Sequence, residues 1–205
     1  MLWLDVLQEA EEIDRRFEEW ERSLTGRWLP MTTIHTISNA LEVTVDFYSD
    51  VQVGKVWNQY RCARIVLHEL IFEIVENLVC ICTSIREGVV PKVQRSAQTI
   101  NTLLSAICNS IPFHLQRVDS KGDLVAQTVQ RVLGGEHLLW PLDVVLHSRW
   151  SNSSQPTQAR KALEEIGTSL GLKQASKAIQ QKQELPTVLV GQDFHARLPT
   201  VSWRA

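Results

Sequence analysis

The chain has 205 residues, a formal net charge of −2, 44% hydrophobic residues and 21% charged residues, which is an ordinary composition for a globular domain. A chain of this length can bury a core without disulfide bonds. The slightly acidic balance argues against non-specific binding to a polyanion, because neutralising phosphates needs clustered Lys and Arg.

Residues 1–24 are predicted to form an amphipathic helix that ends before Gly26 and Pro30. The segment has eight acidic residues and three arginines, a net charge of −5. We expect its charged face to be solvated; a contact with a basic partner is the alternative. Steps of three and four residues separate the apolar positions Trp3, Val6, Ala10, Ile13, Phe17, Trp20 and Leu24. The opposite face carries Glu9, Glu11, Glu12, Asp14, Arg15, Glu18, Glu19 and Arg22.

Residues 31–52 show no helical period. Val43–Tyr48 is rich in β-forming residues and predicts either a short strand or an extended loop. A long central helix is then predicted from about Val53 to Arg86, because its apolar stripe is wide enough to contact several neighbours. The stripe contains Trp57, Tyr60, Arg64, Leu67, Ile71, Ile74, Leu78 and Ile81, broadened by Val56, Ala63, Val66 and Leu70.

Gly88 and Pro91 predict a break after the central helix, and Pro112 predicts the end of the next helix at residues 92–110. A polar turn at residues 119–123 precedes a shorter predicted helix, which Gly134-Gly135 would end near residue 133.

Residues 136–150 predict an apolar helix that contains Pro141. Residues 158–182 predict two short helices separated by Gly171; their net charge of +3 favours solvated surface helices over a polyanion site.

The predicted fold is therefore all-α, an irregular multi-helix bundle around a long central helix. We expect one helical domain at residues 1–184 and an extended or disordered tail at residues 185–205. The chain start shows no signal peptide pattern. The most apolar run, residues 65–85, includes a histidine and three glutamates, so it predicts a core helix and no membrane span.

Few residues indicate catalysis. His68-Glu69 lacks the second histidine of a zinc protease motif, because Phe72 occupies that position. No phosphate-binding glycine loop and no nucleophile elbow occur in the sequence. The four cysteines, which are expected to be buried thiols, have no zinc-site spacing and are Cys62, Cys80, Cys82 and Cys108. The sequence predicts no catalytic residue, metal or cofactor, and no enzyme.

One cluster on the central helix is a candidate ligand-binding site. Arg61 and Arg64 lie three residues apart beside Trp57 and Tyr60, where a buried guanidinium needs an acceptor. One interpretation is a set of salt bridges to acids such as Glu69 within the bundle. The other is a pocket walled by aromatic rings, with an arginine for an anionic group of the ligand.

Five motifs, in this order, resemble the C-terminal regulatory region of fungal transcription factors of the zinc binuclear cluster class. The resemblance spans about residues 1–180. The motifs are Trp20-Glu21-Arg22-Ser23-Leu24 with Arg27-Trp28-Leu29-Pro30, Val56 to Ile65, Ile107 to His114, Gly135 to Leu142, and Leu163 to Ala175.

The resemblance implies a nuclear regulatory domain that restrains or releases transcriptional activation, in some members in response to small molecules and often within secondary-metabolite gene clusters. It implies other transcription-regulatory proteins or a small-molecule effector as partners. The family's six-cysteine DNA-binding cluster is missing from these 205 residues, so no direct DNA binding by this chain is expected.

Two other interpretations stay open. A domain of the same ancestry could serve as a small-molecule-binding protein or enzyme in a biosynthetic pathway, and a helical scaffold of unrelated origin would need no ligand. Self-association into a homo-oligomer is compatible with each of the three, and no membrane partner is expected.

Overall fold

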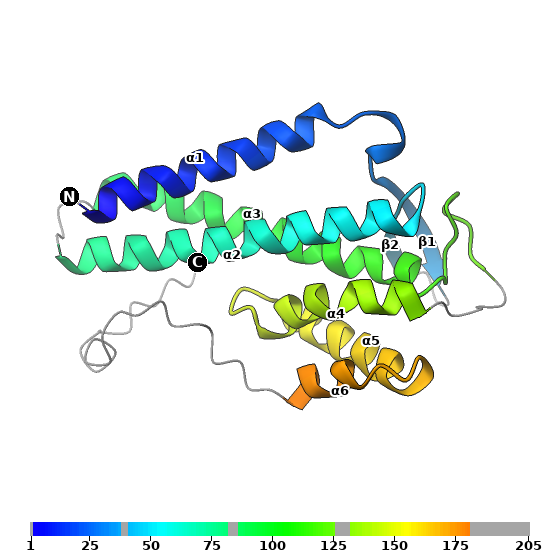
Figure 1. Cartoon of the computed structure of the whole chain (residues 1–205). Coiled ribbons are helices and arrows are strands. Elements are labelled where there is room, and N and C mark those ends of the chain that lie inside the picture. The colour runs from blue at the N-terminus through cyan, green and yellow to red at the C-terminus, as the bar shows by residue number, and fades with distance from the viewer. Residues whose placement is uncertain (1, 38–40, 82–85, 126–131, 181–205) are drawn as a thin grey trace.

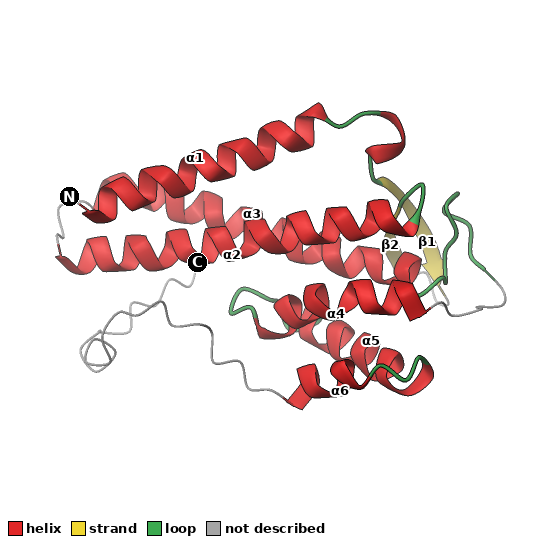
Figure 2. Ribbon diagram, in the orientation of Figure 1, coloured by secondary structure: helices red, strands yellow, loops and turns green. Residues whose placement is uncertain are grey.

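The computed structural model describes residues 2–37, 41–81, 86–125 and 132–180. Within these ranges the chain is mostly helical, as predicted, but it also contains a two-stranded antiparallel sheet (Figures 1 and 2), so the fold is not strictly all-α. The elements are α1 (Leu2–Ser23), a 3₁₀ turn η1 (Gly26–Trp28), β1 (Met31–Ile37), β2 (Leu41–Phe47), α2 (Val51–Ile81), α3 (Arg86–His114), α4 (Val132–His147), α5 (Gln155–Ser169) and α6 (Lys173–Gln180).

Helix α2 organises the core, because it packs against α1, α3 and α4 (Figure 1). The Asp50 carboxylate begins it by accepting hydrogen bonds from the backbone N–H groups of Gln52 and Val53, the usual role of an N-cap. From Trp57 to Leu78 every member of the predicted main stripe is buried. Val66 does not belong to the stripe, since it is 52% exposed.

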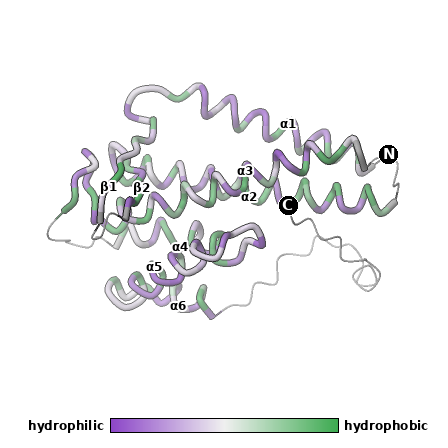
Figure 3. The backbone as a smooth tube through the Cα atoms, turned by 180° about the vertical axis from the view of Figure 1, so that it is seen from behind, coloured by the Kyte–Doolittle hydropathy of each residue, from purple (hydrophilic) through white to green (hydrophobic). Residues whose placement is uncertain are grey.

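Helix α1 packs on α2 through two apolar patches. Near its start, Leu7 and Ala10 join a small cluster with Ile71 and other residues of α2. Near its end, Phe17 and Trp20 pack against the main core. Hydrophilic residues occupy much of the rest of α1 (Figure 3), which fits a helix at the edge of the bundle.

Asp14 lies between these two patches and is only 6% exposed, so its predicted place on the solvated face of the first helix is wrong. Ile13, predicted to be in the stripe, is exposed instead. The buried face of α1 therefore includes Asp14 and not Ile13, because the Asp14 carboxylate contacts Arg64 and His68 of α2.

The hairpin occupies residues predicted to be irregular, apart from the Val43–Tyr48 segment, for which a strand was one alternative. Val45 and Phe47 are buried, and β2 packs against α3. The pairing register sets Ile34 of β1 opposite Thr44 of β2. Met31–Ile37 is rich in Thr and Ile, so β1 carries the same local strand signal as β2.

Helix α3 continues past both prolines that were predicted to bound it. Pro91 lies in its second turn and Pro112 in its last, where a proline removes a single hydrogen bond close to a helix end. The chain then turns at Gln116, which has a positive φ of 56°. The predicted limits of this helix at residues 92 and 110 are therefore too narrow.

The Gly134-Gly135 pair does not end a helix but lies in the first turn of α4. A Cβ at Gly134 would meet the carbonyl oxygen of His114 at 2.1 Å, and one at Gly135 would meet Leu170 at 2.3 Å. The pair thus allows α4 to pass close to the end of α3 and to pack on α5.

Helices α5 and α6 are separated as predicted at Gly171, whose φ is 70°. The short helix predicted to end near residue 133 lies mostly outside the described residues, and the tail predicted at residues 185–205 lies entirely outside them.

Candidate functional site

All four residues of the candidate ligand site are buried on α2, but the two arginines belong to separate polar networks. Trp57 and Tyr60 lie in an aromatic cluster with Trp20 of α1, with ring centroids 4.9–5.7 Å apart. Arg61 is directed toward β2 and α3, and Arg64 toward α1. The two guanidinium groups therefore do not face a common pocket.

The Arg61 guanidinium has protein acceptors on several sides. Its Nη1 donates to the Tyr48 hydroxyl at 2.6 Å, to the Asn58 side-chain oxygen at 3.0 Å and to the Ala106 carbonyl at 3.2 Å. Its Nη2 lies 3.3 Å from Asp46 Oδ2. Burial raises the pKa of Asp46, and the charge of Arg61 opposes that rise. This arrangement is a buried ion pair that joins α2 to the hairpin.

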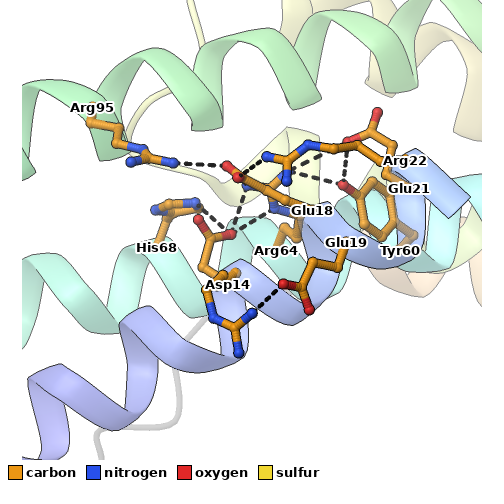
Figure 4. A network of polar contacts seen from close by, with 10 residues as sticks. Asp14, Glu18, Glu19, Glu21, Arg22, Tyr60, Arg64, His68 and Arg95 are labelled. Atoms are coloured by element: carbon orange, nitrogen blue, oxygen red, sulfur yellow. Dashed lines mark hydrogen bonds and ion pairs between the residues drawn. The ribbon is translucent and has the colours of Figure 1, made fainter.

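Arg64 is the centre of the second network (Figure 4). Its Nε donates to Asp14 Oδ1 at 2.7 Å, and its Nη1 donates to the Tyr60 hydroxyl at 2.9 Å. Its Nη2 reaches Glu18 at 3.4 Å, and Glu18 also binds Arg95 of α3 at 2.8 Å. The network thus ties α1 to both α2 and α3.

His68 extends this network into α3. Its Nδ1 lies 3.0 Å from the Ser96 hydroxyl, and its Nε2 lies 3.2 Å from Asp14 Oδ1, off the axis of a well-formed hydrogen bond. Burial acts to raise the pKa of Asp14, but the adjacent His68 and Arg64, which favour the ionised carboxylate, outweigh burial, so this pKa is lowered. The interpretation of Arg64 as a salt-bridged residue predicted this kind of interaction. The acid that it named, Glu69, lies on α2, whereas the observed partners Asp14 and Glu18 lie on α1.

Asp14, His68 and Ser96 are also the residue types of a hydrolytic triad. Ser96 lies in the interior of α3, where intrahelical hydrogen bonds use the neighbouring backbone N–H groups, so these groups are not free to serve as oxyanion donors. Asp14 is bound in addition by Arg64. These three residues form a polar layer between two apolar clusters and line a cavity of about 600 Å³.

An open apolar groove runs between α1 and α2, beside this layer. Its volume is about 480 Å³, within the range of small-molecule sites. Tyr60 is the member of the predicted site that lines it, and its hydroxyl donates to Glu21 of α1 at 2.7 Å. Burial and that hydrogen bond raise the pKa of Tyr60 above its usual value. The groove is lined by Ile13, Arg16, Phe17, Trp20, Val56, Gln59, Tyr60 and Ala63.

The cysteines divide into two kinds. Cys62 and Cys108 are buried, and burial raises the pKa of each thiol to about 12. Cys80 is exposed, so the prediction of a buried thiol is wrong there, and Cys82 lies outside the described residues. No cluster of three metal-binding side chains occurs within the described part of the chain. None of the described helices has the length and apolarity needed to cross a membrane.

Comparison with protein-family models, with curated proteins and with solved structures gives no match to this chain.

Proposed function

We propose that this chain is the regulatory domain of a fungal zinc binuclear cluster transcription factor and that residues 1–205 do not themselves read DNA. We further propose that it acts in the nucleus, within secondary metabolism, by changing how α1 sits on α2. The resemblance of the five motifs is one support. The contacts among these motifs are the other.

Four of the five motifs, which are spread over about 120 residues, contact one another around α2, and this observation carries the proposal. Such convergence is expected when the motifs were inherited together as one folding unit. The contacts are Trp57 Nε1 to Trp28 O at 2.7 Å, Tyr60 Oη to Glu21 Oε2 at 2.7 Å, Asn58 Nδ2 to Ser110 Oγ at 3.0 Å, and the His114 and His137 rings at 6.3 Å.

The interface between α1 and α2 is suited to a switch. A ligand in the groove would contact the ring of Tyr60, whose hydroxyl binds Glu21 of α1 and Arg64 of α2. Part of the contact between α1 and α2 is a layer of ion pairs. Detaching α1 costs less free energy than detaching a helix with a wholly apolar interface, because the separated charges are hydrated again by water. Ligand binding and α1 docking are therefore coupled through one side chain.

A tethering assay tests this proposal. Residues 1–205 are placed between a heterologous DNA-binding domain and an activation segment, and a reporter gene is measured. We expect lower reporter output than with an inert helical spacer of equal length. Arg64→Met, which weakens the docking of α1 on α2, should restore much of the output.

Arg15→Met is the matched control, since Arg15 also forms ion pairs with two acids of α1 but is 53% exposed. It should restrain the reporter as the wild type does. Equal output from the wild type and the inert spacer would contradict the proposal.

The groove also favours the second candidate, a small-molecule-binding protein of the same ancestry. Its apolar wall with Arg16 at the edge fits an aromatic anion, and 1-anilinonaphthalene-8-sulfonate is a suitable probe. Saturable fluorescence that is lost in Ala63→Trp, which fills the groove, would support binding. If Ala63→Trp binds the dye as the wild type does, the groove is not the site.

A further inference from the structure

Strand β1 presents an edge that has no backbone partner within the described residues, where the sheet has only the strands β1 and β2. Natural edge strands are usually protected by a proline, a charged side chain or a bulge. Met31–Ile37 contains no proline, lysine, arginine or carboxylate, and its pairing with β2 is regular. No described strand pairs with this edge, and the hydrogen bond between His35 Nε2 and Gly122 O uses a side chain of β1 and not its backbone, so the backbone edge is available to another strand.

The sequence of β1 is nearly symmetric about Ile34. When the strand is set antiparallel to a copy of itself with Ile34 opposite Ile34, Thr32 faces Thr36 and Thr33 faces His35. Thr–Thr pairs and pairs of β-branched residues are favourable across neighbouring strands, and this register sets no two like-charged side chains opposite each other. A strand that complements itself in this way is suited to a two-fold symmetric contact.

Exposed apolar side chains gather next to this edge. Ile34 is 62% exposed on the face of the sheet that it shares with Thr32 and Thr36, which are also exposed. Just before the strand, Trp28 and Leu29 are exposed as well. Strand β2 is a poorer partner for a second copy, because it carries the acids Glu42 and Asp46 and packs on α3.

We propose that two copies of this chain associate through β1, in antiparallel register centred on Ile34, to form a continuous four-stranded sheet. The exposed side chains of residues 28–34 cover the junction. A contact of one short strand and a few apolar side chains is smaller than a standard protein interface, so the dimer is weak and dissociates on dilution.

Sedimentation equilibrium at chain concentrations up to about 0.5 mM tests this dimer. The wild-type mass should rise with concentration from 23.4 kDa toward twice that value. Ile34→Lys and Ile34→Glu should each remain monomeric, because each sets two like charges face to face. An equimolar mixture of the two variants should regain the dimer, a result that only self-pairing at Ile34 gives.

Thr44→Lys is the matched control, since Thr44 is exposed on β2 directly opposite Ile34 and away from the open edge. It should dimerise as the wild type does. Ile34→Arg replaces Ile34→Lys if the latter loses its helical circular dichroism, because it also sets two like charges opposite each other at position 34. A wild type that stays at monomer mass, or a dimer that survives Ile34→Lys, would overturn the proposal.

Discussion

Removing Arg64 tests whether α1 is held by the buried ionic layer. In Arg64→Met the apolar stem of the side chain is kept and the charge is lost, so the carboxylate of Asp14 is left buried without its main partner. The Arg64 side chain is 7% exposed and that of Asp14 is 9% exposed. Water in the neighbouring polar cavity of about 600 Å³, which Asp14 lines, should therefore replace only part of the lost guanidinium.

The expected cost follows from this burial. Breaking a buried pair by removal of one partner typically costs about 3–5 kcal/mol. His68 stays within 3.2 Å of Asp14 and offsets part of the loss. We therefore expect Arg64→Met to lower the free energy of unfolding by roughly 2–4 kcal/mol, a large part of the usual total of about 5–15 kcal/mol.

Urea unfolding measures this difference, provided that the slope with denaturant is unchanged. Arg15→Met is the control, and its urea midpoint should match that of the wild type, because Arg15 pairs with Glu12 and Glu19 in water. Asp14→Leu combined with Arg64→Met should cost less than the sum of the two single changes, since neither charge is then left alone. Equal midpoints for Arg64→Met and Arg15→Met would refute the reasoning.

Three further predictions concern packing and pH. Ile74→Ala should cost about 2–5 kcal/mol in urea unfolding, because Ile74 is fully buried, whereas Val66→Ala on the exposed side of α2 should cost under about 0.5 kcal/mol. Gly134→Ala should lower the melting temperature, since its Cβ would overlap the His114 carbonyl, and Gly88→Ala, which meets nothing within 4 Å, should not. Burial lowers the pKa of His114 from 6.5 to about 3. Between these two pH values the imidazole is protonated in the unfolded chain but neutral in the folded chain. Stability should therefore fall by up to about 1.4 kcal/mol per pH unit as pH drops from 6.5 toward 3, and His114→Gln should flatten this slope.

Helical periodicity in the sequence located α1 and α2 well, because a surface or core helix must repeat its apolar positions every three or four residues. Breaks predicted from proline and glycine were less accurate. Pro91 and Pro112 fall near helix ends, where they are tolerated, and the Gly134-Gly135 pair serves a close contact with His114. Such a contact depends on residues about 20 positions away and leaves no local signal.

The hairpin shows a different limit. The segment at residues 43–48 has a strand signal, but a strand needs a partner to pair with. The pairing of Met31–Ile37 with it depends on packing against α3, which lies far away in the sequence. Local β propensity is weak evidence until a covering element is known.

The two arginines show why buried polar sites are difficult to assign from sequence. Arg64 was expected to be buried, but a buried arginine with five N–H donors is satisfied equally well by a protein carboxylate or by a ligand. Its partner, Asp14, lies 50 residues upstream. Because many charged residues surround Asp14 in the sequence, the pattern predicts that Asp14 lies on the solvated face of the first helix. One signal was available: Ala10, Asp14 and Phe17 follow the same three–four spacing as the buried positions of α1. Because Arg61 and Arg64 both have protein acceptors, a ligand that bound them would first have to displace an ion pair. A ligand in the apolar groove beside Tyr60 would not have to displace an ion pair. The better candidate for a binding site is therefore this groove between α1 and α2, and not the two arginines.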